Sequence, residues 1–258
     1  MRKLLLAFSV GLFFAACSPN NVQVNEEIGK YFDSAGVKGT FALFDNGTGD
    51  FTIYNLNRYK DSAYSPASTF KVVHSLIALE TGVVSDEKMA IQLDSAITME
   101  TAFKNSIVPY YQEVARRIGK DTMQFWLDSL KYGNHTIGKS IDSFWLNNTI
   151  KLTPDEQLGI MKRLFFNQLP FQKRSHEIVK RMMLRESNAN YQLSYKTGLT
   201  YNEKGDQLGW VVGWIEENKH PYFFVLNMEA PSNIPLVDAR ISILKKILSN
   251  QGFFEGKR

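Results

Sequence analysis

Residues 65–81 read Ser-Pro-Ala-Ser-Thr-Phe-Lys-Val-Val-His-Ser-Leu-Ile-Ala-Leu-Glu-Thr. Apolar residues recur here at helical spacing, which predicts a helix over Thr69–Thr81 with one broad buried face. Ser65-Pro66 stands just before this run, where chains commonly enter a helix. Ser68 and Lys71 lie at the predicted amino end, and their spacing places both side chains on one helix face.

Strands are predicted on both sides of this helix along the chain. Thr40–Asp45 and Phe51–Leu56 read as strands joined by the turn residues Asn46–Asp50, which indicates a hairpin. Asp121–Gln124 and Thr153–Glu156 both have the pattern of a helix capping box. The other predicted elements are helices at Glu26–Ala35, Tyr110–Ile118, Asp121–Lys131, 156–166, 172–185 and Leu236–Ser249, and strands at Leu193–Thr197, Leu208–Glu216 and Tyr222–Glu229.

This order of elements predicts an α+β fold, an α/β sandwich. Strands from both ends of the chain would form an antiparallel β-sheet flanked by helices, beside a mostly helical lobe. The chain has 258 residues and no low-complexity linker, so we expect a single domain at residues 26–258. A hydrophobic content of 44% excludes a disordered chain.

Charge, cysteine and histidine usage exclude several classes of function. The formal net charge is only +4 and the basic residues are scattered, which argues against nucleic acid as a partner. Cys17 is the only cysteine, so an intrachain disulfide is excluded, and its place in the leader excludes a thiol nucleophile. The four histidines do not have the spacing of metal ligands, so we expect no metal site.

The amino terminus has the pattern of an export signal. Arg2 and Lys3 precede the apolar run Leu4–Ala16, which is shorter than the roughly 20 residues of a spanning helix. The run ends in Phe-Ala-Ala-Cys, which resembles a bacterial lipoprotein signal, although a plain cleaved signal is also consistent with it. We therefore expect a signal peptide at 1–17 with Cys17 lipidated, a polar tether at 18–25, and a periplasmic protein that meets a membrane only through its lipid anchor.

Four short motifs carry the chemistry of the chain. They are Ser68-Thr69-Phe70-Lys71, Ser106-Ile107-Val108, Tyr132-Gly133-Asn134 and Lys196-Thr197-Gly198. Each one alone has an ordinary structural explanation, such as a helix cap or a turn. A serine hydroxyl becomes a good nucleophile only beside a base, and a lysine amine becomes a base only if burial lowers its pKa from about 10.4.

Together and in this order, the motifs resemble those of the penicilloyl-serine transferases, and in detail those of class D (oxacillinase-type) serine β-lactamases. Lys104–Ile118, Ile141–Leu146 and Leu208–Trp214 resemble the same stretches of that class. The resemblance implies a serine β-lactamase/D,D-peptidase-like fold. It also implies hydrolysis of β-lactam antibiotics through an acyl-enzyme on Ser68, and hence antibiotic resistance.

The resemblance also implies a role for each site residue. Lys71 would be an N6-carboxylysine, formed from carbon dioxide without any other cofactor, and would be the general base. Backbone N–H groups of Ser68 and Leu199 would hold the oxyanion. The implied sets are catalytic Ser68, Lys71, Ser106 and Lys196, substrate-binding Thr197, Gly198, Leu199 and Arg240, and carbamate-stabilising Trp145, Val108 and Phe70.

Several alternatives stay open at this point. A non-hydrolysing β-lactam sensor would acylate and then stay acylated, and a D,D-peptidase-like penicillin-binding protein would act on peptidoglycan. A class A-type β-lactamase would need a separate glutamate base, and a binding lipoprotein would need no intact catalytic motifs. Small-molecule β-lactams are the expected partners, and the sequence does not distinguish a monomer from a homodimer.

Overall fold

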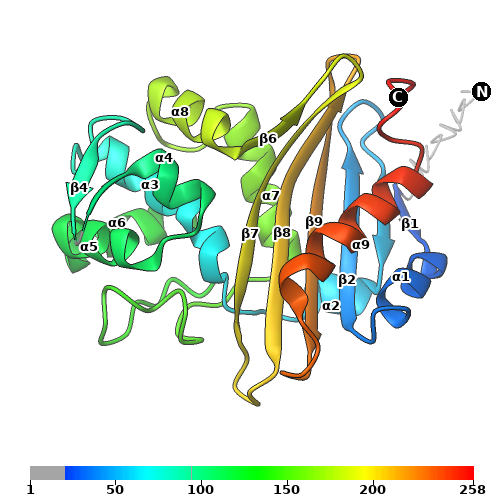
Figure 1. The fold of residues 1–258 in the computed structure, drawn as a ribbon, viewed down its shortest axis with the longest axis horizontal. Helices are drawn as coiled ribbons and strands as arrows, with labels where there is room; N and C mark the ends of the chain where they lie inside the picture. The colour runs from blue at the N-terminus through cyan, green and yellow to red at the C-terminus, as the bar shows by residue number, and fades with distance from the viewer. Residues whose placement is uncertain (1–20, 94) are drawn as a thin grey trace, which may run out of the picture.

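The computed structural model describes residues 21–93 and 95–258, and its centre is a mixed β-sheet. Figure 1 shows this sheet standing between a helical lobe and the carboxyl-terminal helix. The sheet order is β1-β3-β2-β9-β8-β7-β6. The strands are β1 (Val22–Val24), β2 (Lys38–Asp45), β3 (Phe51–Tyr54), β6 (Leu184–Ser187), β7 (Tyr191–Tyr201), β8 (Gln207–Glu217) and β9 (His220–Ala230).

Strands from both ends of the chain build the sheet, which confirms the predicted α+β fold. The amino-terminal hairpin joins the carboxyl-terminal strands where β2 pairs antiparallel with β9. The exception to the antiparallel prediction is β1, which pairs parallel with β3. The predicted tether at 18–25 is therefore wrong for Val22–Val24, which belong to the sheet. The predicted signal peptide at 1–17, with Cys17, lies outside the described residues.

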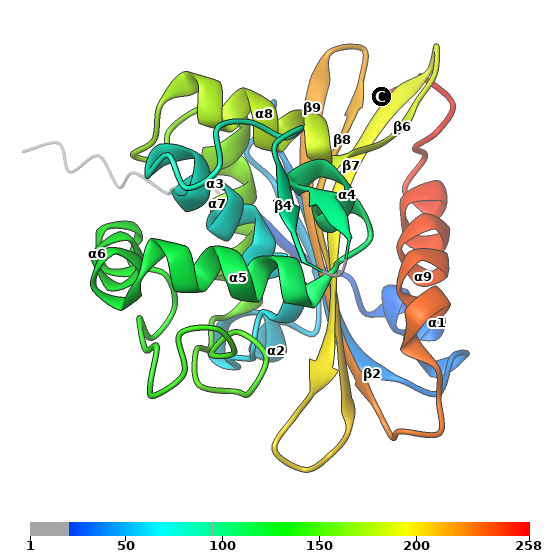
Figure 2. The same ribbon diagram turned by 60° about the vertical axis from the view of Figure 1, so that its left-hand side comes forward.

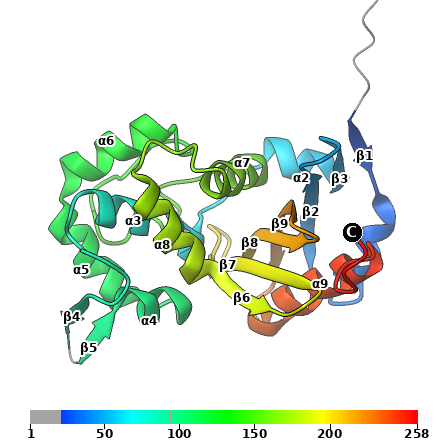
Figure 3. The ribbon, with the colours of Figure 1, turned by 90° about the horizontal axis from the view of Figure 1, so that it is seen from above.

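Helices cover both faces of the sheet. In Figure 3, α9 lies on one face, while α7 and the rest of the helical lobe lie on the other, and Figure 2 shows α1 on the same side as α9. The helices are η1 (Glu26–Ile28), α1 (Gly29–Asp33), α2 (Leu56–Asp61), η2 (Ala67–Phe70), α3 (Lys71–Glu80), α4 (Met99–Lys104), α5 (Val108–Ile118), α6 (Lys120–Leu130), α7 (Pro154–Phe165), α8 (Lys173–Met183) and α9 (Leu236–Asn250). A small antiparallel pair of strands, β4 (Ala90–Gln92) and β5 (Ala96–Thr98), was not predicted. It lies beside the helices of the helical lobe, where Figure 2 labels β4.

Two hydrophobic clusters, one on each face of the sheet, hold these layers together. The larger cluster joins the sheet to the helical lobe and includes all the apolar residues of α3. The smaller one packs α1 and α9 against the other face, through residues such as Phe32, Leu226 and Leu244. Side chains alternate along a strand, so each central strand contributes to both clusters. Ser68 and the Lys-Thr-Gly motif come together where η2 contacts β7.

Local differences from the prediction have local causes. The capping box at Thr153 is confirmed, since its hydroxyl accepts from the Glu156 N–H and the Glu156 carboxylate accepts from the Thr153 N–H. The one predicted at Asp121 is wrong, because α6 begins earlier at Lys120 after Gly119. The predicted helix at 172–185 ends at Met183, because the chain then pairs with β7 as strand β6.

Candidate active site

Ser68 and Lys71 meet at the junction of η2 and α3, where the chain passes from a short 3-10 turn into a helix. Lys71 Nζ donates a hydrogen bond to Ser68 Oγ at 2.8 Å. Ser68 is 7% exposed and Lys71 is fully buried. The two side chains are therefore paired, and the serine is the one that solvent reaches.

The backbone around Ser68 is fixed by hydrogen bonds from several elements. Thr69 Oγ1 donates to the Pro66 carbonyl at 2.7 Å and accepts from Gln157 Nε2 of α7 at 2.7 Å. The Ser65 carbonyl accepts from the Trp210 indole N–H of β8 at 2.9 Å. Ala67, just before the serine, has φ of +51°, a conformation that costs a non-glycine residue about 1–3 kcal/mol. The hydrogen bonds at Pro66, Thr69 and Ser65 hold the turn in this shape, so the chain keeps the strained conformation.

The surroundings of Lys71 favour a neutral amine. Burial lowers its pKa from 10.5 to about 7, because an apolar site disfavours the charged form. No carboxylate pairs with it among the residues that the structure describes. The ring over its amino group is Tyr111 of α5, whose centroid is 5.1 Å from Nζ. This pocket supplies the dry environment that the predicted base requires.

Trp145 packs against Phe70 and His74, the residues on either side of Lys71 at the start of α3, and its predicted contact with a carbamate stays a prediction. Its ring stacks on Phe70 with centroids 5.6 Å apart, and its carbonyl accepts from Ser65 Oγ at 2.9 Å. The indole Nε1 is buried and has no hydrogen-bond partner in the described parts of the chain. Buried donors of this kind are nearly always paired in proteins. The indole therefore has an unused donor available for a further group in the pocket.

Ser106 and Lys196 form a second serine–lysine pair, contributed by different elements. Lys196 Nζ of β7 donates to Ser106 Oγ at 2.5 Å and to the Thr197 carbonyl at 3.1 Å. Burial, together with nearby positive charge led by Lys71, lowers the pKa of Lys196 well below its ordinary value. Ser106 has φ of +56° and does not cap α5. The helix-cap interpretation of Ser106 is thus wrong.

Strand β7 brings the Lys-Thr-Gly motif directly against η2. Gly198 is required here, because a Cβ on it would lie 2.9 Å from the Pro66 carbonyl oxygen. Strand β6 pairs only with residues 192–194 of β7, so the later part of β7 has β8 as its one strand neighbour among the described elements. Thr197 and Leu199 are half-buried on either side of this glycine. The free edge of β7 therefore faces Ser68.

Arg240 reaches the same strand from the other face of the sheet. Its Nη1 donates to the Gly198 carbonyl and its Nε to the Leu236 carbonyl of its own helix, α9. The side chain is buried, and its aliphatic part lies 3.0 Å from where a Cβ on Gly209 would be. Arg240 is thus adjacent to the motif, and its role as a substrate anchor stays a prediction.

The remaining predicted residues surround the pocket. Tyr132-Gly133-Asn134 fixes the loop before α7, since the Asn134 N–H donates to the Lys151 carbonyl at 3.0 Å. Phe70 is fully buried and contacts the Tyr132 ring edge-on. Val108 is half-buried at the first turn of α5. The motif at 132–134 therefore has a structural role, and the carbamate-stabilising roles of Phe70 and Val108 stay predictions.

Sequence reasoning missed three residues of this site. Tyr111 covers the amine of Lys71, Gln157 fixes Thr69, and His74 lies one helical turn after Lys71 with both ring nitrogens buried and without partners in the described chain. For Tyr111 and Gln157 no local signal exists, because their contacts are made between distant elements. For His74 the three-residue spacing from Lys71 was a usable signal.

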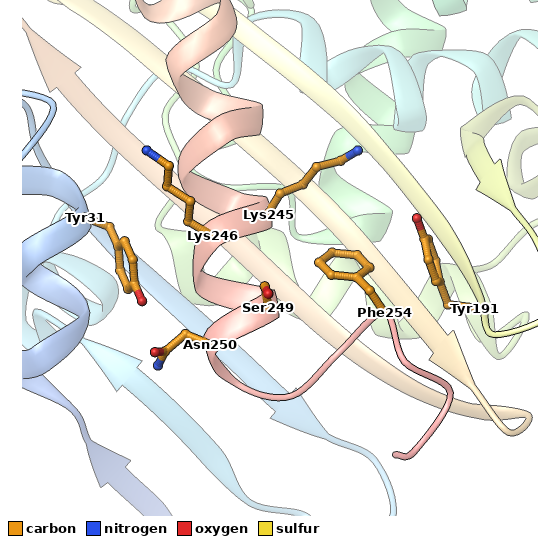
Figure 4. Close-up of a pocket in the computed structure, with 7 residues that line it drawn as sticks. All are labelled: Tyr31, Tyr191, Lys245, Lys246, Ser249, Asn250 and Phe254. Atoms are coloured by element: carbon orange, nitrogen blue, oxygen red, sulfur yellow. The ribbon is translucent and has the colours of Figure 1, made fainter.

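A pocket of about 590 Å³ lies elsewhere, along α9. Figure 4 shows its lining, in which the amino groups of Lys245 and Lys246 point apart. Lys245 is paired with Glu186 at 2.7 Å. None of the motif residues lines this pocket. We therefore place the candidate active site at Ser68, where the paired nucleophile and base lie, and not in this hollow. The described residues contain no cluster of metal-ligand side chains and no helix able to cross a membrane.

Comparisons with known proteins agree with this geometry. The family model of the penicillin binding protein transpeptidase domain matches residues 29–250. The chain is 36% identical over 239 residues to the β-lactamase OXA-48 of Klebsiella pneumoniae, covering 89% of each chain. The solved class D β-lactamase FUS-1 (OXA-85) of Fusobacterium nucleatum subsp. polymorphum is similar with a TM-score of 0.84 and 31% identity, covering 90% of this chain and 100% of that chain.

A receptor domain has a similar structure. The C-terminal domain of the BlaR penicillin-receptor of Bacillus licheniformis gives a TM-score of 0.85 at 27% identity, covering 90% of this chain and 97% of that chain. The fold is thus shared by enzymes and a receptor, whereas the sequence relatives with the higher identities are β-lactamases. The chain belongs to the penicillin-binding-protein transpeptidase family and, within it, to the class D β-lactamases.

Proposed function

We propose that this protein is a class D serine β-lactamase that hydrolyses β-lactam antibiotics through an acyl-enzyme on Ser68. The observation that carries the proposal is the hydrogen bond between Ser68 and a buried Lys71 whose pKa is lowered to about 7. A neutral lysine can accept a proton, and the serine must lose one to attack a carbonyl. Hydrolysis of β-lactams would confer resistance to them on the host cell.

In acylation, Ser68 Oγ forms a bond to the β-lactam carbonyl carbon while Lys71 takes its proton. The amide C–N bond then breaks, and the proton taken up by Lys71 is returned through Ser106 to the departing nitrogen, while Lys196, 2.5 Å from Ser106, would lend positive charge beside it. The N–H groups of Ser68 and Leu199 would hold the oxyanion, and each such donor is worth roughly 3–4 kcal/mol. Thr197 and Arg240, on or against β7, would bind the substrate carboxylate.

The pocket also fits a carboxylated Lys71. Carbon dioxide reacts only with a neutral amine, and burial supplies one. A carbamate needs donors, and the unpartnered indole N–H of Trp145 is available inside the same pocket. The modification supplies a base with two oxygens. The carbamate on Lys71 would activate the water that hydrolyses the acyl-enzyme and releases the product. Carbon dioxide would then be the one added group that the proposed mechanism requires.

Turnover of a chromogenic cephalosporin, measured with and without bicarbonate, tests this proposal. We expect multiple turnovers per enzyme and a rate that rises with bicarbonate. Ser68→Ala should show no drug adduct by mass spectrometry and should lose roughly 10⁴–10⁶-fold in turnover. A wild-type protein that neither binds drug covalently nor hydrolyses it would contradict the function.

A sensor is the second candidate, since the receptor domain of BlaR has a similar structure. A sensor is acylated once and does not release product. Electrospray mass spectra taken at seconds and at one hour distinguish the two functions, because an enzyme returns to its unmodified mass when the drug is consumed. A persistent stoichiometric adduct would favour the sensor. A D,D-peptidase would be recognised by release of D-alanine from a peptidoglycan peptide.

We also propose that the protein is exported to the periplasm and anchored by a lipid on Cys17. The basic, apolar and small residues of 1–17 support this location. In cells, Cys17→Ala should move the protein from the membrane fraction to the soluble periplasmic fraction and prevent labelling by a palmitate analogue. A wild-type protein that is soluble and unlabelled would contradict the anchor.

A further inference from the structure

Of the six buried side-chain polar atoms without partners in the described part of the chain, three belong to two rings that pack beside the start of α3. His74 Nδ1, His74 Nε2 and Trp145 Nε1 are all buried and unpaired within the described residues. The two rings are in contact, edge to face, with centroids 5.3 Å apart. His74 is fully buried on the same face of α3 as Lys71, one turn later.

Tyr111 connects these groups. Its ring centroid is 5.1 Å from Lys71 Nζ and 5.1 Å from the centroid of the His74 ring. The Tyr111 hydroxyl is paired with Ser75 at 2.7 Å, and within the described residues it makes no hydrogen bond to the imidazole. Because buried polar groups are nearly always hydrogen-bonded, we expect the working site to hold a polar group within reach of these nitrogens.

A count of donors and acceptors identifies the chemistry of that group. The Trp145 indole is a donor only, and a neutral imidazole has one donor and one acceptor. The group they share must therefore offer acceptors. A carbamate on Lys71 has two oxygens, so it can accept from the indole and still accept from a second donor.

We propose that His74 is a positioning residue that donates one ring N–H to the carbamate of Lys71 and so retains it. This inference rests on the function proposed above, because His74 has this role only if Lys71 is carboxylated. A hydrogen bond to a charged acceptor is stronger than a neutral one, which makes the second donor significant for an anion held away from water. His74 acts through Lys71 and does not touch the substrate.

The imidazole would act as a neutral donor. Burial, with the nearby charge of Lys71, lowers the pKa of His74 to about 3. The aromatic rings packed around it belong to Phe70, Tyr111 and Trp145, and Lys71 is the charged group that faces it. A carbamate would remove the contribution of the Lys71 charge, but burial is the larger cause and would persist, so we expect the imidazole to remain neutral.

The test uses the full-length protein with ¹³C-labelled bicarbonate. We would compare wild type with His74→Leu, His74→Met, His74→Asn and His74→Gln, by the ¹³C carbamate signal and by the bicarbonate concentration that gives half-maximal turnover. For His74→Leu we expect that concentration to rise at least about tenfold, with turnover largely restored at saturating bicarbonate. The Asn amide lies near the Nδ1 position and the Gln amide near Nε2, so rescue by one of them identifies the donating nitrogen.

His176 provides the matched control. It is also fully buried with an unpaired Nε2 within the described chain, but it lies on α8 and contacts Phe171. His176→Leu removes a similar ring without changing the Lys71 pocket, and we expect an unchanged bicarbonate requirement. Methionine fills the space of the ring with a flexible apolar side chain. If His74→Leu does not fold, His74→Met therefore provides the same comparison of bicarbonate requirement with wild type.

The outcomes separate this inference from the proposed function. If wild type shows both a carbamate signal and turnover, and the Leu and Met variants need no more bicarbonate than wild type, the role of His74 is wrong and the function stands. If wild type shows neither signal nor turnover, the function itself fails. A tenfold shift that is equal in His176→Leu would mean a general loss of stability and would also overturn the role of His74.

Discussion

Two lysines on opposite faces of the sheet have opposite environments. Lys71, on the helical-lobe side, is fully buried, lacks a carboxylate partner in the described chain, and has its pKa lowered to about 7. Lys245, on α9, is 43% exposed in its side chain and lies 2.7 Å from the Glu186 carboxylate, which raises its pKa above 10.5. The comparison teaches that burial without a counter-charge, and not residue type, makes a lysine a candidate base.

Among the variants that test this comparison of lysines, Lys71→Ala should produce the largest effect. Removing a general base costs about 10²–10⁴-fold in rate, and this base would serve both acylation and deacylation. Steady-state turnover and the fraction of acyl-enzyme measure the two steps. Lys245→Ala is the matched control, with turnover expected within twofold of wild type. Near-normal deacylation in Lys71→Ala would show that Lys71 is not the base, and its different environment from Lys245 would then have no catalytic meaning.

Trp145→Phe should have a smaller effect on the same pocket. Phenylalanine keeps an aromatic ring against Phe70 but removes the unpartnered N–H. We expect the bicarbonate concentration for half-maximal turnover to rise about tenfold. Trp126→Phe on α6, where the ring packs on Phe171, is the control. An unchanged bicarbonate requirement in Trp145→Phe would show that the indole does not hold the carbamate.

The pH dependence of the ¹³C carbamate signal should test whether Lys71 must be neutral to react with carbon dioxide. Its folded pKa of about 7 lies below its ordinary value, so the amine is charged, and unable to bind carbon dioxide, as pH falls through 7. Forming the carbamate from the charged amine releases two protons, one from the ammonium and one when the amine adds carbon dioxide. At constant dissolved carbon dioxide, once the carbamate is the minor form, its ¹³C signal should therefore fall about a hundredfold for each pH unit below 7. Lys196 also has a lowered pKa, and the carbamate signal distinguishes the two, since it reports Lys71 alone.

Lys245→Ala should have the smallest effect, and on stability alone. An exposed ion pair contributes about 0–1 kcal/mol to the free energy of unfolding. Because the pair raises the pKa of Lys245, its contribution is present at neutral pH and is lost as pH rises through that raised value. Urea denaturation of wild type and variant at pH 7 measures it. A loss well above 1 kcal/mol would mean that this lysine also packs as a core residue.

Local sequence patterns predicted the parts of the fold whose causes are local. The hairpin around residues 46–50 and the capping box at Thr153 form as expected, because their hydrogen bonds close within a few residues. Strand β6 was missed, because Leu184–Ser187 becomes a strand only by pairing with β7. The parallel strand β1 was missed for the same reason, since Val22–Val24 needs β3 beside it.

The candidate site divides in the same way. Ser68, Lys71, Ser106 and Lys196 could be chosen from their motifs, and the structure brings them into two hydrogen-bonded pairs. The contact of Ser106 with Lys196 joins residues far apart in the chain, so spacing alone could not give it. Tyr111, Gln157 and the unpaired nitrogens of His74 and Trp145 became visible only when the elements were packed together.

The sequence by itself determined most of the longer helices and strands, the motif residues and the class of chemistry, because side-chain type and short-range periodicity are present in the chain itself. The tertiary structure alone decided the protonation of Lys71. An amine loses its charge only when several distant segments together exclude water from it, and the desolvation that results is a property of the packed pocket and of no single stretch of residues.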